Sequence, residues 1–437
     1  MPTLLLGLIA VAVFIVMLGT LRWWSTALIA VIIATTLVPR PIGVEIAGVP
    51  LQTYDVVIVG VFVIGFVVSR RPNFALFLPF LVLLVLGAIF EWEPDPQLST
   101  NVLYLLVGVA AWAVGTYFAK HYVPGSRHET VLIVSLTVLI LFQAVVTVLQ
   151  ASGVPIFALQ GRTAELEGGR ASGTFSHPGT VGKVMILFMA ILLPLTGSAT
   201  ARTRRLAYFA VLVALVPVGL SESRANFVGY LLALLVWFII MPARSAKASR
   251  FVVPAVVLAG ALIFSGTIID RFTGDPEGGA RQHFVEVALE AISKNPWLGV
   301  GPGNYIPVVG QTDNLTAQGW RVHNVFLLEI TELGIPTALF FFLPAVVLII
   351  LSIRLMRRVD ETGAWARGAI AAAAGTLVTA VTGWGLMNGS IFMIWFLCMG
   401  FSFGMLGRRG SPEFGPTAAT ARAKRGTRTR QARVSAA

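Results

Sequence analysis

One short polar segment, Arg321-Val-His323-Asn324, stands directly before a long apolar run of the chain. The imidazole of His323 is the side chain in this segment that can take a proton from a hydroxyl group near neutral pH. Asn324 is a good N-cap for the helix that the apolar run predicts, so His323 is expected just outside a helix N-terminus. The positive end of the helix dipole favours the neutral imidazole there. A structural, hydrogen-bonded histidine at the membrane interface is the alternative.

Arginines are the second group of side chains that could serve a catalytic or binding function, because the guanidinium fork binds phosphate groups through paired hydrogen bonds. Four arginines in or beside polar links between apolar runs are candidates for this role: Arg170, Arg224, Arg281 and Arg321. The alternative is that each anchors its link at the interface or pairs with a nearby carboxylate such as Glu165, Glu167 or Glu222.

The long polar segment that ends at Asn324 predicts one amphipathic helix over residues 281–293. Phe284, Ala288 and Ile292 recur at intervals of four residues, while glutamine and glutamate occupy the other face. Pro296 then ends the helix. This spacing predicts a helix that packs on the membrane surface.

Gly299, Gly301 and Gly303 follow in alternation and predict a tight turn in which the backbone can approach a ligand closely. A purely structural turn is the alternative. The spacing matches neither a dinucleotide-binding fingerprint nor a phosphate-binding loop with Gly-Lys-Ser/Thr. Further on, Gly334 and Pro336 predict a kink in the helix after His323.

Glu329 and Glu332 precede that kink inside the apolar run. Carboxylates inside a membrane span are costly unless they are hydrated or paired. Both are therefore candidate functional residues.

Composition requires a lipid environment for most of the chain. Of 437 residues, 56% are hydrophobic and 12% are charged, whereas soluble domains have about 25% charged residues. Apolar runs of spanning length recur, which predicts an all-α polytopic membrane protein. Much of the net charge of +12 lies in short links and the C-terminal tail, as in membrane proteins generally, and does not indicate nucleic-acid binding. The single cysteine, Cys398, excludes an intrachain disulfide and a cysteine zinc cluster.

About 12 or 13 spans are expected, the lower number if the runs 4–20 and 25–39 form one re-entrant element. The first run lacks a basic start and a cleavage site, so we expect a retained span rather than a signal peptide. A loop rich in Gly and Pro is expected from Arg40 to Tyr54. The other spans are expected at about 55–69, 73–90, 101–119, 130–150, 180–197, 206–220, 225–241, 251–269, 325–353, 367–387 and 390–406.

The basic links predict which loops face outward. They put loops 151–177, 221–226 and 270–324 on the external side. Residues 1–407 are then one transmembrane catalytic domain with a larger external loop, 270–324, and residues 408–437 are a basic, disordered cytoplasmic tail. External arginines run against the positive-inside rule, which makes Arg170, Arg224, Arg281 and Arg321 informative.

The order of these residues resembles a known family. Asn295-Pro-x-x-Gly-x-Gly-x-Gly, followed by His323-Asn324, nine residues and Gly334-x-x-Thr337, is similar to the pattern of the O-antigen ligase family. In that family a histidine followed by Asn, Ser or Gln closes the large external loop. The resemblance covers about residues 160–340 at the level of motifs. The family also includes polymerases of lipid-linked glycans, so the resemblance indicates reaction class better than substrate.

The resemblance implies a GT-C-type glycosyltransferase of the cytoplasmic (inner) membrane. It would move a glycan from a polyprenyl-diphosphate donor to a hydroxyl of a glycan or lipid acceptor on the outer face, with inversion at the anomeric carbon. His323 would be the base, and Arg224 and Arg281 best match the family's diphosphate-binding arginines. The full predicted substrate-binding set is Arg170, Arg224, Arg281, Arg321 and Asn324. No metal or other cofactor is expected, because the arginines supply the positive charge.

Two other functions remain open. A polymerase would use the same chemistry with another lipid-linked glycan as acceptor. A solute transporter would need polar sites near the middle of spans in both halves. Gln143 and Asn388 are sparse candidates for such sites, whereas polar groups gather in the loops, which favours the enzyme.

Overall fold

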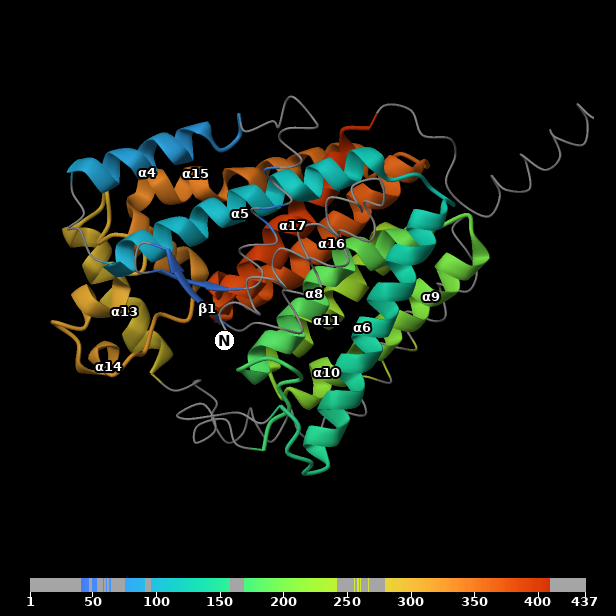
Figure 1. The fold of residues 1–437 in the computed structure, drawn as a ribbon, viewed down its shortest axis with the longest axis horizontal. Coiled ribbons are helices and arrows are strands. Elements are labelled where there is room, and N and C mark those ends of the chain that lie inside the picture. Colours follow the sequence, from blue (N-terminus) through green and yellow to red (C-terminus); the bar gives the residue numbers. More distant parts are fainter. Residues whose placement is uncertain are drawn as a thin grey trace, which may run out of the picture.

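The computed structural model describes residues 75–90, 96–157, 169–241 and 280–408, a hairpin within residues 41–52, and single positions between 58 and 63 and between 255 and 266. These residues form a bundle of long apolar helices (Figure 1), which confirms the all-α polytopic prediction. The loop expected from Arg40 to Tyr54 instead contains two short antiparallel strands, β1 (Pro41–Ile46) and β2 (Val49–Gln52).

The described helices are α4 (Leu78–Phe90), α5 (Pro96–His121), α6 (Arg127–Ala151), α8 (Pro178–Leu195), α9 (Ala201–Val213), α10 (Leu215–Leu220), α11 (Arg224–Ile240), α13 (Arg281–Lys294), α14 (Asn314–Ala317), α15 (Val325–Leu355), α16 (Glu361–Thr382) and α17 (Gly389–Leu406). A π-helical turn, η2 (Tyr305–Val309), and a 3₁₀ turn, η3 (Gly385–Met387), complete the helical elements of this part of the chain.

Seven segments of the described chain are long and apolar enough to cross a membrane, and two shorter apolar helices, Leu78–Ile89 and Arg224–Ile240, coincide with further predicted spans. The predicted spans 4–20 and 25–39 lie outside the described residues, and so do nearly all of 55–69 and 251–269. The total of 12 or 13 therefore stays a prediction, as does the disordered tail, of which only Arg408 is described.

Two predicted spans have different limits in the structure. The span expected at 367–387 begins at Glu361, because Asp360 caps α16 by accepting a hydrogen bond from the Gly363 N–H (3.0 Å), and it ends at Thr382 before an extended glycine. The span expected at 206–220 consists of α9 and α10, which meet at Ala214. Pro217 has no N–H to donate to the preceding turn, which favours a break there.

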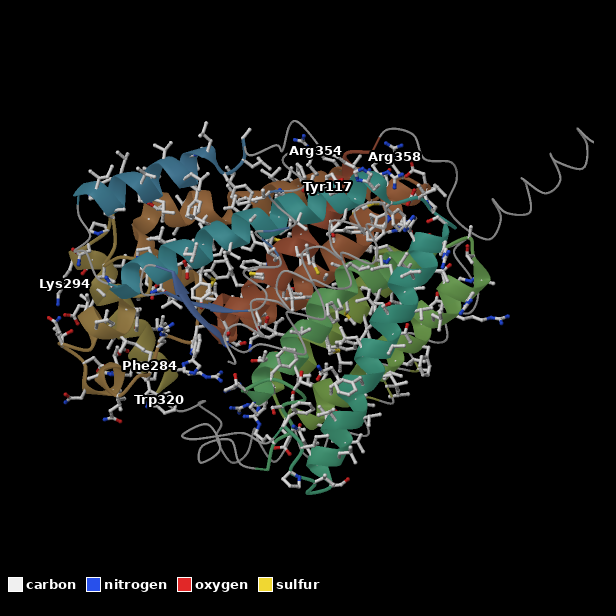
Figure 2. All side chains as sticks on the ribbon, in the orientation of Figure 1. Tyr117, Phe284, Lys294, Trp320, Arg354 and Arg358 are labelled. Carbon is white, nitrogen blue, oxygen red and sulfur yellow. The ribbon has the colours of Figure 1, made fainter. Side chains whose placement is uncertain are left out.

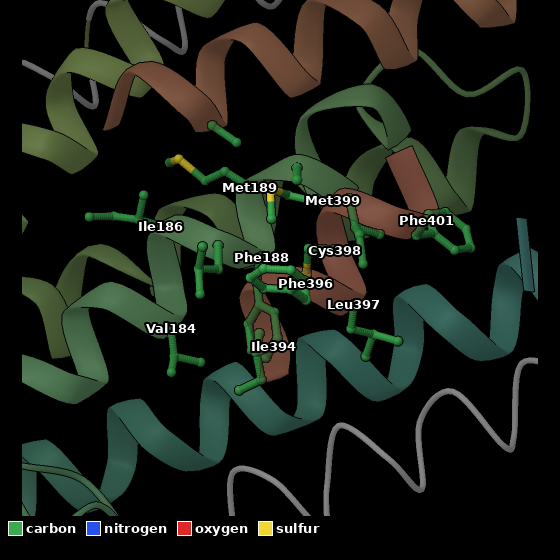
Figure 3. Packing of buried hydrophobic residues seen from close by; sticks show 14 of the residues in the cluster. Val184, Ile186, Phe188, Met189, Ile394, Phe396, Leu397, Cys398, Met399 and Phe401 are labelled. Carbon is green, nitrogen blue, oxygen red and sulfur yellow. The ribbon is translucent and has the colours of Figure 1, made fainter. Parts of the chain in front are cut away.

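Glycines allow the central helices to approach one another closely. A Cβ atom on Gly229 of α11 would lie 2.6 Å from the Gly375 carbonyl oxygen of α16, and one on Gly400 of α17 would overlap the Trp112 carbonyl of α5. Small residues at such contacts are a common device for packing helices in membranes. Buried apolar side chains of α8 and α17 pack together in the core of the bundle (Figure 3).

The end of the bundle that carries the basic links is held together around a buried carboxylate. Glu129 of α6 is 0% exposed. It accepts hydrogen bonds from the Tyr122 hydroxyl (2.7 Å), the Gly125 N–H (2.9 Å) and the Ser198 hydroxyl (2.7 Å). These bonds join the α5–α6 link to the α8–α9 link, so two of the predicted cytoplasmic turns lie together.

The predicted external loops meet at the other end. The Ala171 N–H donates to the Leu220 carbonyl (3.3 Å), and the Asn226 amide donates to the Gly179 carbonyl (2.9 Å). Figure 2 shows Phe284 and Trp320 of the long loop at the end of the molecule opposite to Arg354 and Arg358. The predicted external loops thus lie at one end of the bundle, as expected if successive links alternate between the two sides of the membrane. Which of the two ends faces outward remains a prediction.

Candidate active site

His323 is held at the start of α15 by an N-cap, as the sequence predicts. The Asn324 side-chain oxygen accepts hydrogen bonds from the N–H groups of Phe326 (2.9 Å) and Leu327 (3.1 Å). The imidazole lies against the ring of Phe284 in α13, with 6.0 Å between ring centroids. A fixed backbone on one side and an aromatic ring on the other orient the histidine.

Phe284 belongs to a small core inside the long loop. It packs with Ala288 on the buried face of α13 against Tyr305, Val322 and Leu328. The glutamine and glutamates of α13 are exposed, which confirms the amphipathic helix predicted for 281–293. This core fixes α13 onto the beginning of α15 and therefore places Arg281 and His323 at the same end.

The surroundings of His323 favour the neutral imidazole. Burial lowers the pKa of His323, and the positive charges of Arg281, Lys183 and His177 lower it further. A hydrogen bond with the Arg321 backbone has the opposite, smaller effect and raises this pKa. Nδ1 of His323 is buried and has no hydrogen-bond partner among the described residues. A neutral imidazole with an unengaged ring nitrogen can accept a proton.

This shift predicts the pH dependence of the reaction expected from the sequence. The base predicted at His323 is the neutral imidazole, which is lost as the pH falls through a pKa that lies below 6.5, the ordinary value for histidine. We expect kcat/KM for glycan transfer, which reports groups of the free enzyme, to decline only below pH 6.5. The decline in kcat should lie at higher pH, because a bound anionic donor favours the imidazolium. A decline in kcat/KM centred above pH 6.5 would contradict the assignment.

The N-terminal ends of three helices lie in the electrostatic surroundings of this histidine, and the start of a fourth is hydrogen-bonded to one of them. They belong to α8, α11, α13 and α15. Asn226 ties the first turn of α11 to that of α8, while electrostatic interactions link His323 to Arg281 at the start of α13 and to His177 at the start of α8. Helix N-termini carry positive partial charge and suit anions.

Arg170 and Arg224 lie at the same end, with different local roles. Arg170 donates from Nε (3.0 Å) and Nη2 (2.7 Å) to the Ser221 carbonyl, which fastens its loop to the link between α10 and α11. Arg224 is the first residue of α11, whose N-cap residue, Ser223, makes no side-chain capping bond. Their binding of a substrate anion remains a prediction.

Arg321 and Asn324 have structural partners close by. Arg321 lies over the Trp384 ring, 5.3 Å from its centroid, and interacts electrostatically with Glu329 and Glu332. The oxygen of Asn324 is used in the helix cap. Both were predicted to bind substrate, which stays a prediction. The contacts seen here give each residue a role in holding the start of α15.

The glycine turn contacts α15 rather than an open surface. Gly334 has a φ of 76° and interrupts the helix, as predicted for a kink. The Val300 N–H donates to the Thr331 carbonyl (2.9 Å), the Gly301 N–H donates to the Glu332 carbonyl (2.8 Å), and the Pro296 carbonyl accepts from the Ile335 N–H (2.8 Å). The turn thus supplies hydrogen bonds that the broken helix cannot make for itself.

The buried carboxylates of α15 take part in the same junction. Glu329 and Glu332 are 3% and 6% exposed. Oε2 of Glu332 accepts a hydrogen bond from the Gly303 N–H (2.6 Å). With Arg321 nearby, this bond offsets part of the cost of burying charge. Glu332 therefore helps to hold the glycine turn in place.

Two residues that act electrostatically on His323 were missed by the sequence analysis, Lys183 in α8 and His177, which caps that helix by accepting from the Gly179 N–H (2.9 Å). A lysine within an otherwise apolar span was the available signal for the first. For His177 the available signal was weaker, a histidine directly before the proline that begins a span. Within the described residues, no three His, Cys, Asp or Glu side chains gather as a metal site would require.

The comparison with known families agrees with this arrangement. Residues 209–342 match the family model described as O-antigen ligase. The matched stretch takes in Arg224, Arg281, the glycine turn and His323. The comparison with curated proteins gave no match. The resemblance to this family is thereby confirmed at the level of the matched stretch, and the chain is a multi-pass membrane protein of which residues 209–342 are similar to O-antigen ligases.

Proposed function

We propose that this protein transfers a glycan from a polyprenyl-diphosphate donor to a hydroxyl acceptor at the external face of the cytoplasmic membrane. The observation that carries the proposal is the setting of His323, whose buried Nδ1 has no hydrogen-bond partner among the described residues and whose pKa is lowered by burial and by the charges of Arg281, Lys183 and His177. A base and an anion-binding environment at one place are what this reaction needs.

The proposed reaction is a single displacement. His323 takes the proton from the acceptor hydroxyl while its oxygen attacks the anomeric carbon of the donor. The bond between that carbon and the diphosphate oxygen breaks, and the polyprenyl diphosphate leaves with the bonding electrons. General-base assistance contributes about 10²–10⁴-fold in rate. Attack opposite to the leaving group inverts the configuration at the anomeric carbon.

The leaving diphosphate gains charge as the bond breaks, and cations fixed in advance stabilise it. Arg224 begins α11 and Arg281 begins α13, two helices whose N-cap residues make no side-chain capping bond. In the proposed complex, these positive helix ends and guanidinium groups bind the same diphosphate. Arg170 is the third arginine proposed for this set.

Arg224→Ala tests the donor site. We expect purified protein in liposomes to transfer glycan from the lipid-linked donor, and the variant to show a KM for donor raised about tenfold or more, since a hydrogen bond to a charged group contributes about 1.5–3 kcal/mol. Arg205→Ala is the matched control, an exposed arginine of α9 near the opposite end. An unchanged donor KM in Arg224→Ala would put the diphosphate elsewhere.

The same assay separates a ligase from a polymerase. A ligase transfers the glycan to an acceptor that carries no polyprenyl chain, whereas a polymerase elongates a second lipid-linked glycan and produces a ladder of products. Solute uptake by the liposomes without any transfer would instead support the transporter.

A further inference from the structure

Lys183 is a cation inside the first turns of the membrane helix α8, and its ammonium is fixed by the backbone. Nζ donates a hydrogen bond to the Gly179 carbonyl (3.1 Å), and the same carbonyl accepts from the Asn226 amide of α11 (2.9 Å). The lysine therefore does not extend into lipid. It is turned back toward the helix N-terminus, where α8 and α11 meet.

A glycine on another element leaves room for this side chain. A Cβ atom on Gly385, in the turn between α16 and α17, would lie 3.1 Å from Nζ and 3.2 Å from Cε of Lys183. The residue before it, Trp384, is the one that Arg321 covers. Lys183 is thus enclosed between the start of α8 and the turn that contacts the His323 segment.

The charges around Lys183 are positive. Arg170 acts electrostatically on Lys183, and Lys183 acts together with Arg281 and His177 on His323. Within the described part of the chain, Lys183 forms no ion pair with a carboxylate. Like charges gathered at a membrane interface repel one another, and an anion bound among them would remove that cost.

We propose that Lys183 contacts the diphosphate of the lipid-linked donor, from the interior side of the bundle, as a further cation of the donor site. This inference rests on the proposed function and deepens it. The ammonium is a compact charge that suits one phosphate oxygen, while the guanidinium groups of Arg224 and Arg281 suit paired contacts with the others. The cations would then hold the diphosphate from more than one side.

The test measures binding of unglycosylated polyprenyl diphosphate and polyprenyl monophosphate to the full-length protein. We expect Lys183→Met to weaken diphosphate binding about tenfold or more, from the loss of a charged hydrogen bond of about 1.5–3 kcal/mol. Monophosphate binding should fall less, and Lys183→Arg should restore part of the diphosphate affinity. Lys120→Met is the matched control, an exposed lysine at the end of α5 near the opposite end of the bundle.

A second variant keeps the Lys183 ammonium and tests the inference independently, in case Lys183→Met does not fold. Gly385→Ala places a methyl group next to Nζ and should displace the ammonium, so we expect a smaller but selective loss of diphosphate binding. Equal diphosphate affinity in wild type, Lys183→Met and Gly385→Ala would overturn the inference and leave the proposed function standing. A folded wild-type protein that binds no polyprenyl diphosphate would overturn the proposed function itself.

Discussion

His323→Ala should abolish glycan transfer, with a loss of about 10²–10⁴-fold, the range for removing a general base. His323 lies before α15 rather than within its core, and the cap that starts the helix belongs to Asn324. The variant should therefore unfold at nearly the same temperature as wild type and still bind polyprenyl diphosphate. Loss of transfer with retained donor binding separates proton transfer from donor recognition.

His323→Gln refines this test, because glutamine can form hydrogen bonds and cannot accept a proton at neutral pH. It should be about as inactive as His323→Ala. His121→Ala is the matched control, an exposed histidine at the opposite end whose Nδ1 lies 2.9 Å from the Tyr117 carbonyl. Transfer at the wild-type rate in either His323 variant would remove this residue from the mechanism.

Gly334→Ala should have the largest effect on stability. The residue has a φ of 76°, and an added Cβ would overlap the Trp297 carbonyl and lie 2.6 Å from the Leu298 nitrogen. Strain at a positive φ costs about 1–3 kcal/mol, and overpacking typically adds about 1–3 kcal/mol. Because these are backbone atoms of the glycine turn, the turn must shift away from α15. We expect a lower unfolding temperature and reduced transfer.

Gly153→Ala supplies the control for backbone strain alone. Gly153 has a φ of 85°, and nothing lies within 4 Å of a Cβ built there. The difference in unfolding temperature between Gly334→Ala and Gly153→Ala then reports the contact between the turn and α15. Two variants with the same unfolding temperature would show that this contact does not stabilise the protein.

Features that depend on local sequence were predictable. The cap at Asn324, the buried face of α13 and the kink at Gly334 follow from the preferences and spacing of neighbouring residues, and the structure has all three. Span positions were predictable to within several residues, since length and apolarity set them. The later start of α16 in the prediction arose because Asp360 was not recognised as its cap.

Features that depend on contacts between distant segments were not predictable. Nothing in the sequence near Val300 shows that its N–H would bond to Thr331, so the glycine turn could equally have faced a ligand. Lys183 was read as part of an apolar span. Its electrostatic effect on His323 depends on the turn η3, which contacts both α8 and α15, and on the folding of the long loop onto the start of α15. Trp384 beneath Arg321 is a third contact of this kind.

The junction between the glycine turn and α15 limits which parts of the protein can serve as a gate. If residues 296–301 swung away to admit a substrate, the carbonyls of Thr331 and Glu332 and the Ile335 N–H would lose their partners. Unsatisfied backbone groups at membrane depth cost several kcal/mol each. Substrate entry and product exit should therefore leave this junction intact, and the glycan and its carrier must pass through openings formed by other segments.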